Sequence, residues 1–209
     1  MNLLHHRICR SDRWRKTIQQ RVPWVISDAE LGPNLLELGP GPGLTTDLLR
    51  SRVQRLTALE IDTKAAESLG ARLRDSNVDV VAGDATAMPF GDAQFSGGVS
   101  FTMLHHVPSR ALQDKMLREV RRVLQPGGVF VGSDSLRSPF MRLIHIGDTC
   151  VLVNPDTFAA RLEAAGFEVL ELEKSREAFR FHARRPSRDD MRDRLTQSAF
   201  KDLAPGGIK

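Results

Sequence analysis

The sequence contains no tyrosine and only two cysteines, Cys9 and Cys150. The missing tyrosines weaken the case for a protein that stacks nucleic-acid bases on aromatic side chains. The two cysteines lie far apart and match no spacing of metal ligands, so we interpret them as unpaired thiols in a reducing compartment. The chain also lacks an HxxxH motif and a close cluster of carboxylates, and we therefore expect no bound metal.

Long apolar runs are missing as well. No uninterrupted apolar stretch approaches the length that is needed to span a bilayer. The first residues read MNLLHHRICRSDRWRK and lack the hydrophobic core of a signal peptide. We therefore expect a cytoplasmic protein with no membrane span.

The residues that are present suit a single globular domain. Hydrophobic residues make up 41% and charged residues 27% of the chain, and 209 residues are enough to bury a substantial core. Basic residues gather near the two ends, at Arg7, Arg10, Arg13, Arg15 and Lys16 and at Arg180, Arg184, Arg185 and Arg188. Such patches can contact nucleic acid or anionic lipid, but we expect solvated surface here and do not favour a nucleic-acid partner.

Strand and helix patterns alternate along the chain. Strands are predicted at 34–38, 55–61, 78–81, 95–101 and 129–131, with helices after Gly43, at 63–74 and after Ser109, where Pro126-Gly127-Gly128 ends the helix. This alternation predicts an α/β fold with a doubly wound, mostly parallel sheet and helices on both faces. A helix that begins at Asn154 and a hairpin of 167–172 and 178–183 follow, and the hairpin adds an antiparallel strand.

We divide the chain into three parts. Residues 1–30 read as an N-terminal helical cap, in which Pro23 interrupts or kinks the helix. Residues 31–185 form the ligand-binding domain, in which 133–153 reads as irregular. Residues 186–209 are polar and are expected to form a surface helix or a partly disordered tail.

A glycine-rich loop follows the first strand in the sequence LLELGPGPGLTT. A strand, a glycine turn and a helix place backbone N–H groups and a helix N-terminus against a ligand. The dinucleotide fingerprint GxGxxG fails, because Leu44 stands where the third glycine is required. The phosphate-binding loop fails too, because no Gly-Lys-Ser/Thr follows.

Three acidic residues lie in or at the ends of successive strands, Glu37, Glu60 and Asp84. Glu37 beside the loop disfavours a phosphate and favours a cationic ligand. Glu60 is placed to accept both hydroxyls of a ribose, and Asp84 to accept from an adenine amino group. Asp84 can instead stabilise a turn, and Asp62 reads as a helix N-cap. An adenosyl ligand without phosphates, S-adenosylmethionine (SAM), fits this set.

Five motifs in this order resemble those of the class I SAM-dependent methyltransferases. They read LLELGPGPG, LTALEID, GDATAMPF, FSGGVSFTMLHHV and REVRRVLQPGGVFVGSDS, and they extend from about residue 33 to residue 183. The nearest branch is similar to the small single-domain enzymes of quinone biosynthesis. This resemblance implies a Rossmann-like, seven-stranded sheet with strand order 3-2-1-4-5-7-6 and an antiparallel strand 7.

The resemblance also implies roles for individual residues. Gly39, Gly41 and Gly43 are expected along the methionine and ribose of SAM, with Glu37 supporting the loop and the ammonium group. Glu60 is expected at the ribose and Asp84 and Ala85 at the adenine, and Ile61 is a further expected cofactor-binding residue. Thr102, Met103 and Leu104, just past the fourth strand, are expected to face the methyl donor. These assignments take in all ten predicted cofactor-binding residues, which are Glu37, Gly39, Gly41, Gly43, Glu60, Ile61, Asp84, Ala85, Thr102 and Leu104.

His105 and His106 are the candidate catalytic residues. An imidazole at this place can deprotonate an acceptor hydroxyl near neutral pH, and a local structural role is the equal alternative. His145 and Asp148 are further candidates to line the acceptor site. His5 and His6 read as surface residues of the N-terminal helix.

The expected reaction is transfer of a methyl group from SAM to a small-molecule acceptor, on carbon or oxygen, by in-line displacement. The sequence TMLH stands where nucleic-acid amino-methyltransferases carry Asn-Pro-Pro-aromatic, and neither cysteine suggests covalent catalysis on a pyrimidine. An RNA methyltransferase and a non-catalytic SAM-binding partner subunit remain alternatives, with a NAD-dependent oxidoreductase behind them.

Overall fold

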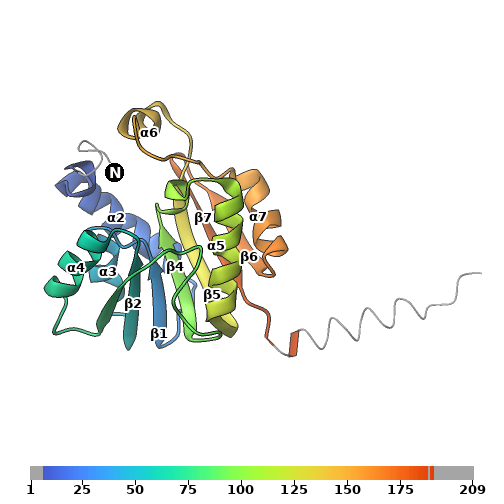
Figure 1. The fold of residues 1–209 in the computed structure, drawn as a ribbon. Coiled ribbons are helices and arrows are strands. Elements are labelled where there is room, and N and C mark those ends of the chain that lie inside the picture. Colours follow the sequence, from blue (N-terminus) through green and yellow to red (C-terminus); the bar gives the residue numbers. More distant parts are fainter. Residues whose placement is uncertain (1–6, 188, 191–209) are drawn as a thin grey trace, which may run out of the picture.

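A computed structural model describes residues 7–187 and 189–190. Its centre is one seven-stranded sheet with the order β3-β2-β1-β4-β5-β7-β6 (Figure 1). The strands are β1 Asn34–Leu38, β2 Arg55–Glu60, β3 Val78–Ala82, β4 Phe95–Phe101, β5 Leu124–Ser135, β6 Glu168–Lys174 and β7 Ala178–Arg184. β7 pairs antiparallel with both β5 and β6, and the other pairings are parallel. The predicted fold class and strand order are confirmed.

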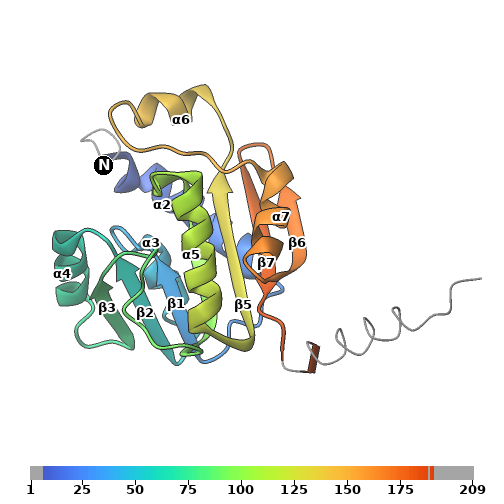
Figure 2. The same cartoon turned by 45° about the vertical axis from the view of Figure 1, so that its right-hand side comes forward.

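Helices cover both faces of this sheet. They are α2 Asp12–Ile26, α3 Leu44–Leu49, α4 Thr63–Arg72, α5 Arg110–Val123, α6 Pro139–Ile144 and α7 Pro155–Ala164, with a 3₁₀ turn, η1, at Leu104–His106. α2, α3 and α4 lie on one face, and α5 and α7 lie on the other (Figures 1 and 2). α6 stands above the carboxyl ends of the strands, which is the edge where ligands bind in such sheets.

Side-chain caps begin three of these helices at the residues that the sequence predicts. The carboxylate of Asp62 accepts from Ala65 N at 3.0 Å, and Ser109 Oγ accepts from Leu112 N at 3.2 Å. Asn154 Oδ1 accepts from Asp156 N at 3.0 Å. Each cap satisfies one of the N–H groups that the first helical turn leaves without a partner.

The core consists of two apolar clusters, one on each side of the sheet. Met116, Val120 and Phe158 belong to the cluster under α5 and α7, and Ile18 and Leu69 belong to the cluster under α2 and α4. The central strands β1 and β4 lie between these clusters and are buried almost throughout, as is typical of strands that helices cover on both faces.

Three local predictions differ from the structure. α5 ends at Val123, and β5 begins at once and passes through Pro126-Gly127-Gly128, so those residues do not end the helix. This part of the strand is held by Arg185, whose N donates to Gly128 O and whose O accepts from Gly127 N, both at 2.8 Å. The irregular stretch contains α6, because Ser138 caps it and Pro139 suits its first turn. α2 continues past Pro23 to Ile26, so of the two predicted effects of Pro23 the interruption is wrong.

No helix among residues 7–187 and 189–190 is long and apolar enough to cross a membrane. Cys9 and Cys150 are both free thiols. The predicted tail at 186–209 lies almost wholly outside the described residues, as do His5 and His6.

Candidate functional site

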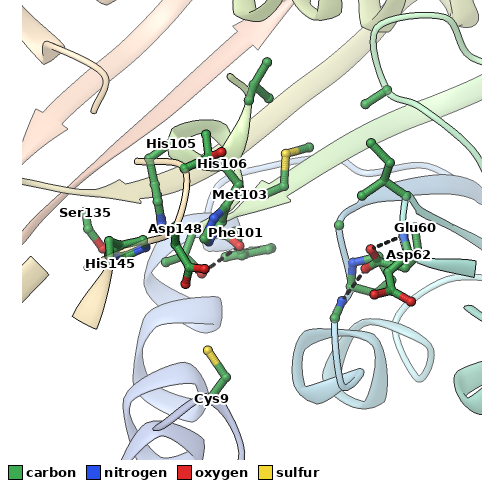
Figure 3. A pocket seen from close by; sticks show the side chains of 18 of the residues that line it. Cys9, Glu60, Asp62, Phe101, Met103, His105, His106, Ser135, His145 and Asp148 are labelled. Atoms are coloured by element: carbon green, nitrogen blue, oxygen red, sulfur yellow. Dashed lines mark hydrogen bonds between the residues drawn. The ribbon is translucent and has the colours of Figure 1, made fainter. Parts of the chain in front are cut away.

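A cavity of about 620 Å³ opens at the carboxyl ends of the central strands. Its walls come from the glycine loop, from the ends of β2, β3 and β4, from α2 and from the segment around α6. The close view shows Glu60 and Asp62 on one side and His105, His106, His145 and Asp148 on the other, with Met103 between them (Figure 3). The volume lies within the range of small-molecule sites.

The glycine loop contributes open backbone at one position and tight packing at another. A Cβ on Gly41, where φ is +53°, would meet no atom within 4 Å, so the backbone there borders free space in the cavity. Gly43 differs, because a Cβ there would collide with Leu69 and Arg72 of α4. Gly43 begins α3 with a φ of +84°, a conformation that suits glycine, and it does not line the cavity. Gly39 lies under Met103 and does line it.

Glu60 joins the glycine loop to the end of β2. Its Oε2 accepts from Gly41 N and its Oε1 from Asp62 N, each at 3.0 Å. The side chain is 7% exposed and faces the cavity. A carboxylate oxygen can accept two hydrogen bonds, so each oxygen keeps one lone pair for a ligand hydroxyl. Ile61, next to it, also lines the cavity and is 72% exposed.

Glu37 points into the protein rather than into the cavity. It is 1% exposed, and its carboxylate accepts hydrogen bonds from the hydroxyls of Thr45 and Thr46 on α3. Burial raises the pKa of Glu37 to about 7, although the two hydroxyls oppose this shift. This geometry fits the predicted support of the loop. Glu37 does not line the cavity, and its predicted contact with the ammonium group of SAM stays a prediction.

Asp84 makes a turn at the end of β3. Its Oδ1 accepts from Thr86 N at 2.7 Å and its Oδ2 from Thr86 Oγ1 at 2.9 Å. This is the turn role that the sequence left open beside the adenine role. Asp84 and Ala85 both line the cavity, so adenine recognition stays a prediction for them.

Thr102 and Met103, just past the end of β4, both line the cavity. Thr102 has a φ of +52°, a left-handed conformation that is uncommon for a β-branched residue. Its N donates to Ser133 O at 2.8 Å, which holds it in place. Strained residues of this kind are concentrated at binding and catalytic sites. Leu104 is fully buried and does not line the cavity.

His105 pairs with a buried carboxylate. His105 Nδ1 lies 2.5 Å from Asp134 Oδ1, and His105 N donates to Asp134 Oδ2 at 3.1 Å. Burial alone would raise the pKa of Asp134, but attraction to His105 and three hydrogen bonds, including one from Ser135 N, lower it below its ordinary value. An ionised Asp134 therefore accepts from Nδ1–H and leaves Nε2 as the basic nitrogen of His105.

Two further histidine rings lie against His105. The ring centroids of His105 and His106 are 4.2 Å apart, and those of His145 and these two rings are 5.0 Å and 5.2 Å apart. Burial lowers the pKa of His145, although its hydrogen bond to the Met141 carbonyl opposes the shift. All three rings and Asp148 line the same end of the cavity (Figure 3).

Sequence reasoning missed two features of this site. Asp134 was not singled out, although it is an acid near the end of an apolar strand, the same signal that identified Glu60. His145 was expected at the acceptor site, but its contact with the His105 and His106 rings was missed, because no sequence spacing shows that α6 folds back over η1.

The cavity suits an adenosyl ligand at its Glu60 end. Glu60 offers lone pairs to hydroxyls, the backbone at Gly41 leaves room, and Ile61 offers an exposed apolar face. Seven of the ten predicted cofactor-binding residues line the cavity; Glu37, Gly43 and Leu104 do not. Their contacts with a cofactor stay a prediction.

Comparison with known proteins also indicates a methyltransferase. Residues 36–132 match the family model described as a methyltransferase domain. A probable S-adenosylmethionine-dependent methyltransferase of Mycolicibacterium smegmatis is 30% identical over 145 residues, which are 66% of this chain and 53% of that protein. The 24-methylenesterol C-methyltransferase 2 of Oryza sativa subsp. japonica is 30% identical over 179 residues, 78% of this chain and 48% of that protein. The chain thus spans about half the length of these relatives.

A probable ribosomal RNA small subunit methyltransferase A of Thermococcus sibiricus matches a shorter stretch, with 32% identity over 103 residues, 44% of this chain and 38% of that protein. Among solved structures, a putative methyltransferase from Bacillus halodurans superposes with a TM-score of 0.65 at 18% identity and covers 83% of this chain and 99% of its own. The structural likeness shows the fold alone. The family model and the sequence relatives show that the chain belongs to the class I SAM-dependent methyltransferases, whose cofactor is S-adenosylmethionine.

Proposed function

We propose that this protein transfers a methyl group from SAM to a small, largely apolar acceptor, on oxygen or carbon. The observation that carries the proposal is the two-ended cavity. One end presents the carboxylate of Glu60 beside the glycine loop, and the other presents Phe101 and Ile144, the latter next to His145 in the chain, beside the histidines. The name of the rice relative gives a sterol as its acceptor, which agrees with an apolar site.

The residues of the chain would bind and orient the two reactants. Glu60 holds the ribose, and Gly41 lets the cofactor lie against the loop. When bound, SAM supplies a methyl group already activated on a sulfonium. Trp14 and Ile18 of α2 and Met141 of α6 line the cavity and exclude water from the reacting atoms. Orientation of two reactants in this way can contribute about 7–11 kcal/mol to lowering a barrier.

His105 is the proposed base for an acceptor that carries a hydroxyl. Asp134 holds the Nδ1–H, which fixes the tautomer and leaves Nε2 to accept the acceptor proton. An acceptor that is methylated on carbon has no hydroxyl proton to lose at the reacting atom. The His105–Asp134 pair therefore has this role only if the acceptor is methylated on oxygen.

Calorimetry with S-adenosylhomocysteine tests the cofactor assignment. Loss of charge-assisted hydrogen bonds to the ribose should weaken binding to Glu60→Gln by about 10-fold or more. Glu67→Gln, on the exposed side of α4, is the matched control and should bind as the wild type does. Absence of binding to the wild type at millimolar ligand, or equal affinity of Glu60→Gln, would overturn the proposal.

RNA methylation is the second candidate, supported by the ribosomal RNA methyltransferase relative and by the basic N-terminal residues. Transfer of a tritiated methyl group to total RNA, compared with transfer to an extract of apolar small molecules, separates the two. Labelling of RNA, together with an affinity for RNA that falls steeply as the salt concentration rises, would favour RNA methylation.

A further inference from the structure

We propose that His105, His106 and His145 form a binding site for a divalent transition metal of the zinc type, with an open position toward the acceptor end of the cavity. One ligand nitrogen of each ring lies within 4.8 Å of those of the other two. Zinc binds histidine nitrogen at 2.0–2.1 Å, so tetrahedral ligands stand about 3.4 Å apart. Each pair therefore has to approach by at most about 1.4 Å, which small side-chain rotations provide.

The hydrogen bonds behind two of the rings are those that metal-binding histidines make. His105 Nδ1 is held by the Asp134 carboxylate, and His145 Nδ1–H donates to the Met141 carbonyl at 2.8 Å. A histidine that binds metal through one nitrogen usually donates its other N–H to a carboxylate or a backbone carbonyl, which fixes the ring and its tautomer. Both rings thus keep Nε2 as the nitrogen with a lone pair. With a metal bound, the Nε2 lone pair of His105 binds the ion, so His105 can serve as the proposed base only in the metal-free protein.

The segment that carries His145 is fixed relative to the other two histidines. Val151 N donates to His105 O at 2.7 Å. Gln113 of α5 donates to both Leu104 O and Val151 O, at 3.0 Å and 2.7 Å. Two points of attachment join η1 to the chain just after α6, so the approach of His145 to η1 is built into the fold.

The charges and the ligand type indicate the class of metal. The negative charges of Asp134 and Asp148 would attract a cation bound at His145. The positive charge of Arg21 on α2 interacts with that of Asp134 and partly offsets it. Three imidazoles select zinc and its neighbours in the transition series, whereas magnesium and calcium prefer oxygen ligands. Three protein ligands leave a fourth position open. If the proposed methyl transfer is correct, on which this last step rests, that position selects acceptors that offer a hydroxyl or a thiol.

The test uses the full chain without a histidine tag, stripped with a chelator and titrated with Zn²⁺ and with Co²⁺. We expect one metal per chain by elemental analysis and the visible spectrum of tetrahedral Co²⁺. His145→Ala should lose both. Asp134→Asn keeps all three ligands and should weaken metal affinity by about 10–100-fold.

The chain has six histidines, which permits a matched control. The combined variant His5→Ala, His6→Ala and His182→Ala keeps the cluster and should still bind one metal. No stoichiometric binding to the wild type, or binding that persists in His145→Ala, would overturn the metal site. Calorimetry with S-adenosylhomocysteine on the metal-free protein is independent of this result, so failure of the metal site and failure of the proposed function are distinguishable. Unchanged S-adenosylhomocysteine affinity in His145→Ala would show that the variant is folded.

Discussion

At the scale of single residues, Glu37 and Glu60 are two similar acids near the glycine loop that have different roles. The carboxylate of Glu37 lies in the strand before the glycine loop, but it turns inward and holds the first turn of α3 through Thr45 and Thr46. Glu60, at the end of the neighbouring strand, faces the cavity and holds the loop through Gly41 N. Two similar acids thus have different tasks because the direction of each side chain, and its burial, differ.

The raised pKa of Glu37 predicts an unusual dependence of stability on pH. In the folded protein this carboxyl group titrates near pH 7, above its ordinary value of 4.5, so folding favours the protonated form. The contribution is fully present below about pH 4.5 and is lost as the pH rises to about 7. The free energy of unfolding should fall by about 3 kcal/mol over this window because of Glu37.

Glu37→Gln removes this titration and retains a side chain that can hydrogen-bond the two threonines. In urea unfolding between pH 5 and 8, the stability of this variant relative to the wild type should therefore rise with pH. Glu67→Gln serves again as the control. Parallel pH profiles for Glu37→Gln and the wild type would contradict the prediction.

At the scale of the elements, β5 is the strand that connects the site to the rest of the sheet. It lies between β4 and β7, and its carboxyl end carries Asp134 beside His105. The neighbouring strands approach β5 closely at Gly132 because glycine has no Cβ. A Cβ there would collide with the backbone oxygen of Ser100 and would lie 2.6 Å from Phe181 Cζ. Backbone cannot move aside as a flexible side chain does.

Gly132→Ala should therefore destabilise the protein by about 1–3 kcal/mol, the usual cost of overpacking a core. Gly98→Ala in β4 is the matched change, because its Cβ would meet Phe130, Leu124 and Val120 at ordinary contacts of 3.5–3.6 Å. We expect the second variant to lie within about 1 kcal/mol of the wild type. Chemical denaturation compares the two, and an equal loss in both would disprove the role given to Gly132.

At the scale of the whole molecule, a chain of buried polar contacts joins α7 to the site. Arg161 of α7 donates to Asp114 Oδ1 at 2.6 Å and to Gln113 Oε1 at 2.9 Å, both on α5. Gln113 in turn holds η1 and the segment before α7. Arg161 is 7% and Gln113 1% exposed, whereas the side chain of Asp114 is 33% exposed.

Arg161→Ala should lower the free energy of unfolding by about 1–3 kcal/mol, because the buried Gln113 Oε1 loses its donor and the partly exposed Asp114 loses its cation. Arg55→Ala removes the exposed pair with Asp79, whose side chains are 68% and 53% exposed, and should cost at most about 1 kcal/mol. Equal losses in urea unfolding would show that burial does not decide the strength of these pairs.

The sequence by itself determined the sheet, the helix caps and the ligand class. Alternating strands and helices predict a parallel sheet, Asp62, Ser109 and Asn154 are caps as expected, and the family motifs imply the observed strand order. These features depend on patterns within one element or on motifs at strand ends, so they can be read along the chain. Where a local signal had two readings, as at Asp84, the sequence left both open.

Only the tertiary structure decided what stands opposite Glu60. Glu37 turns inward and Gly43 packs against α4, because side-chain direction at a strand end and the position of a neighbouring helix are set by packing. Asp134 comes to His105 through the pairing of β4 with β5, and His145 through the return of α6 over η1. Contacts between distant segments depend on how the elements pack, and no spacing in the sequence carries that information.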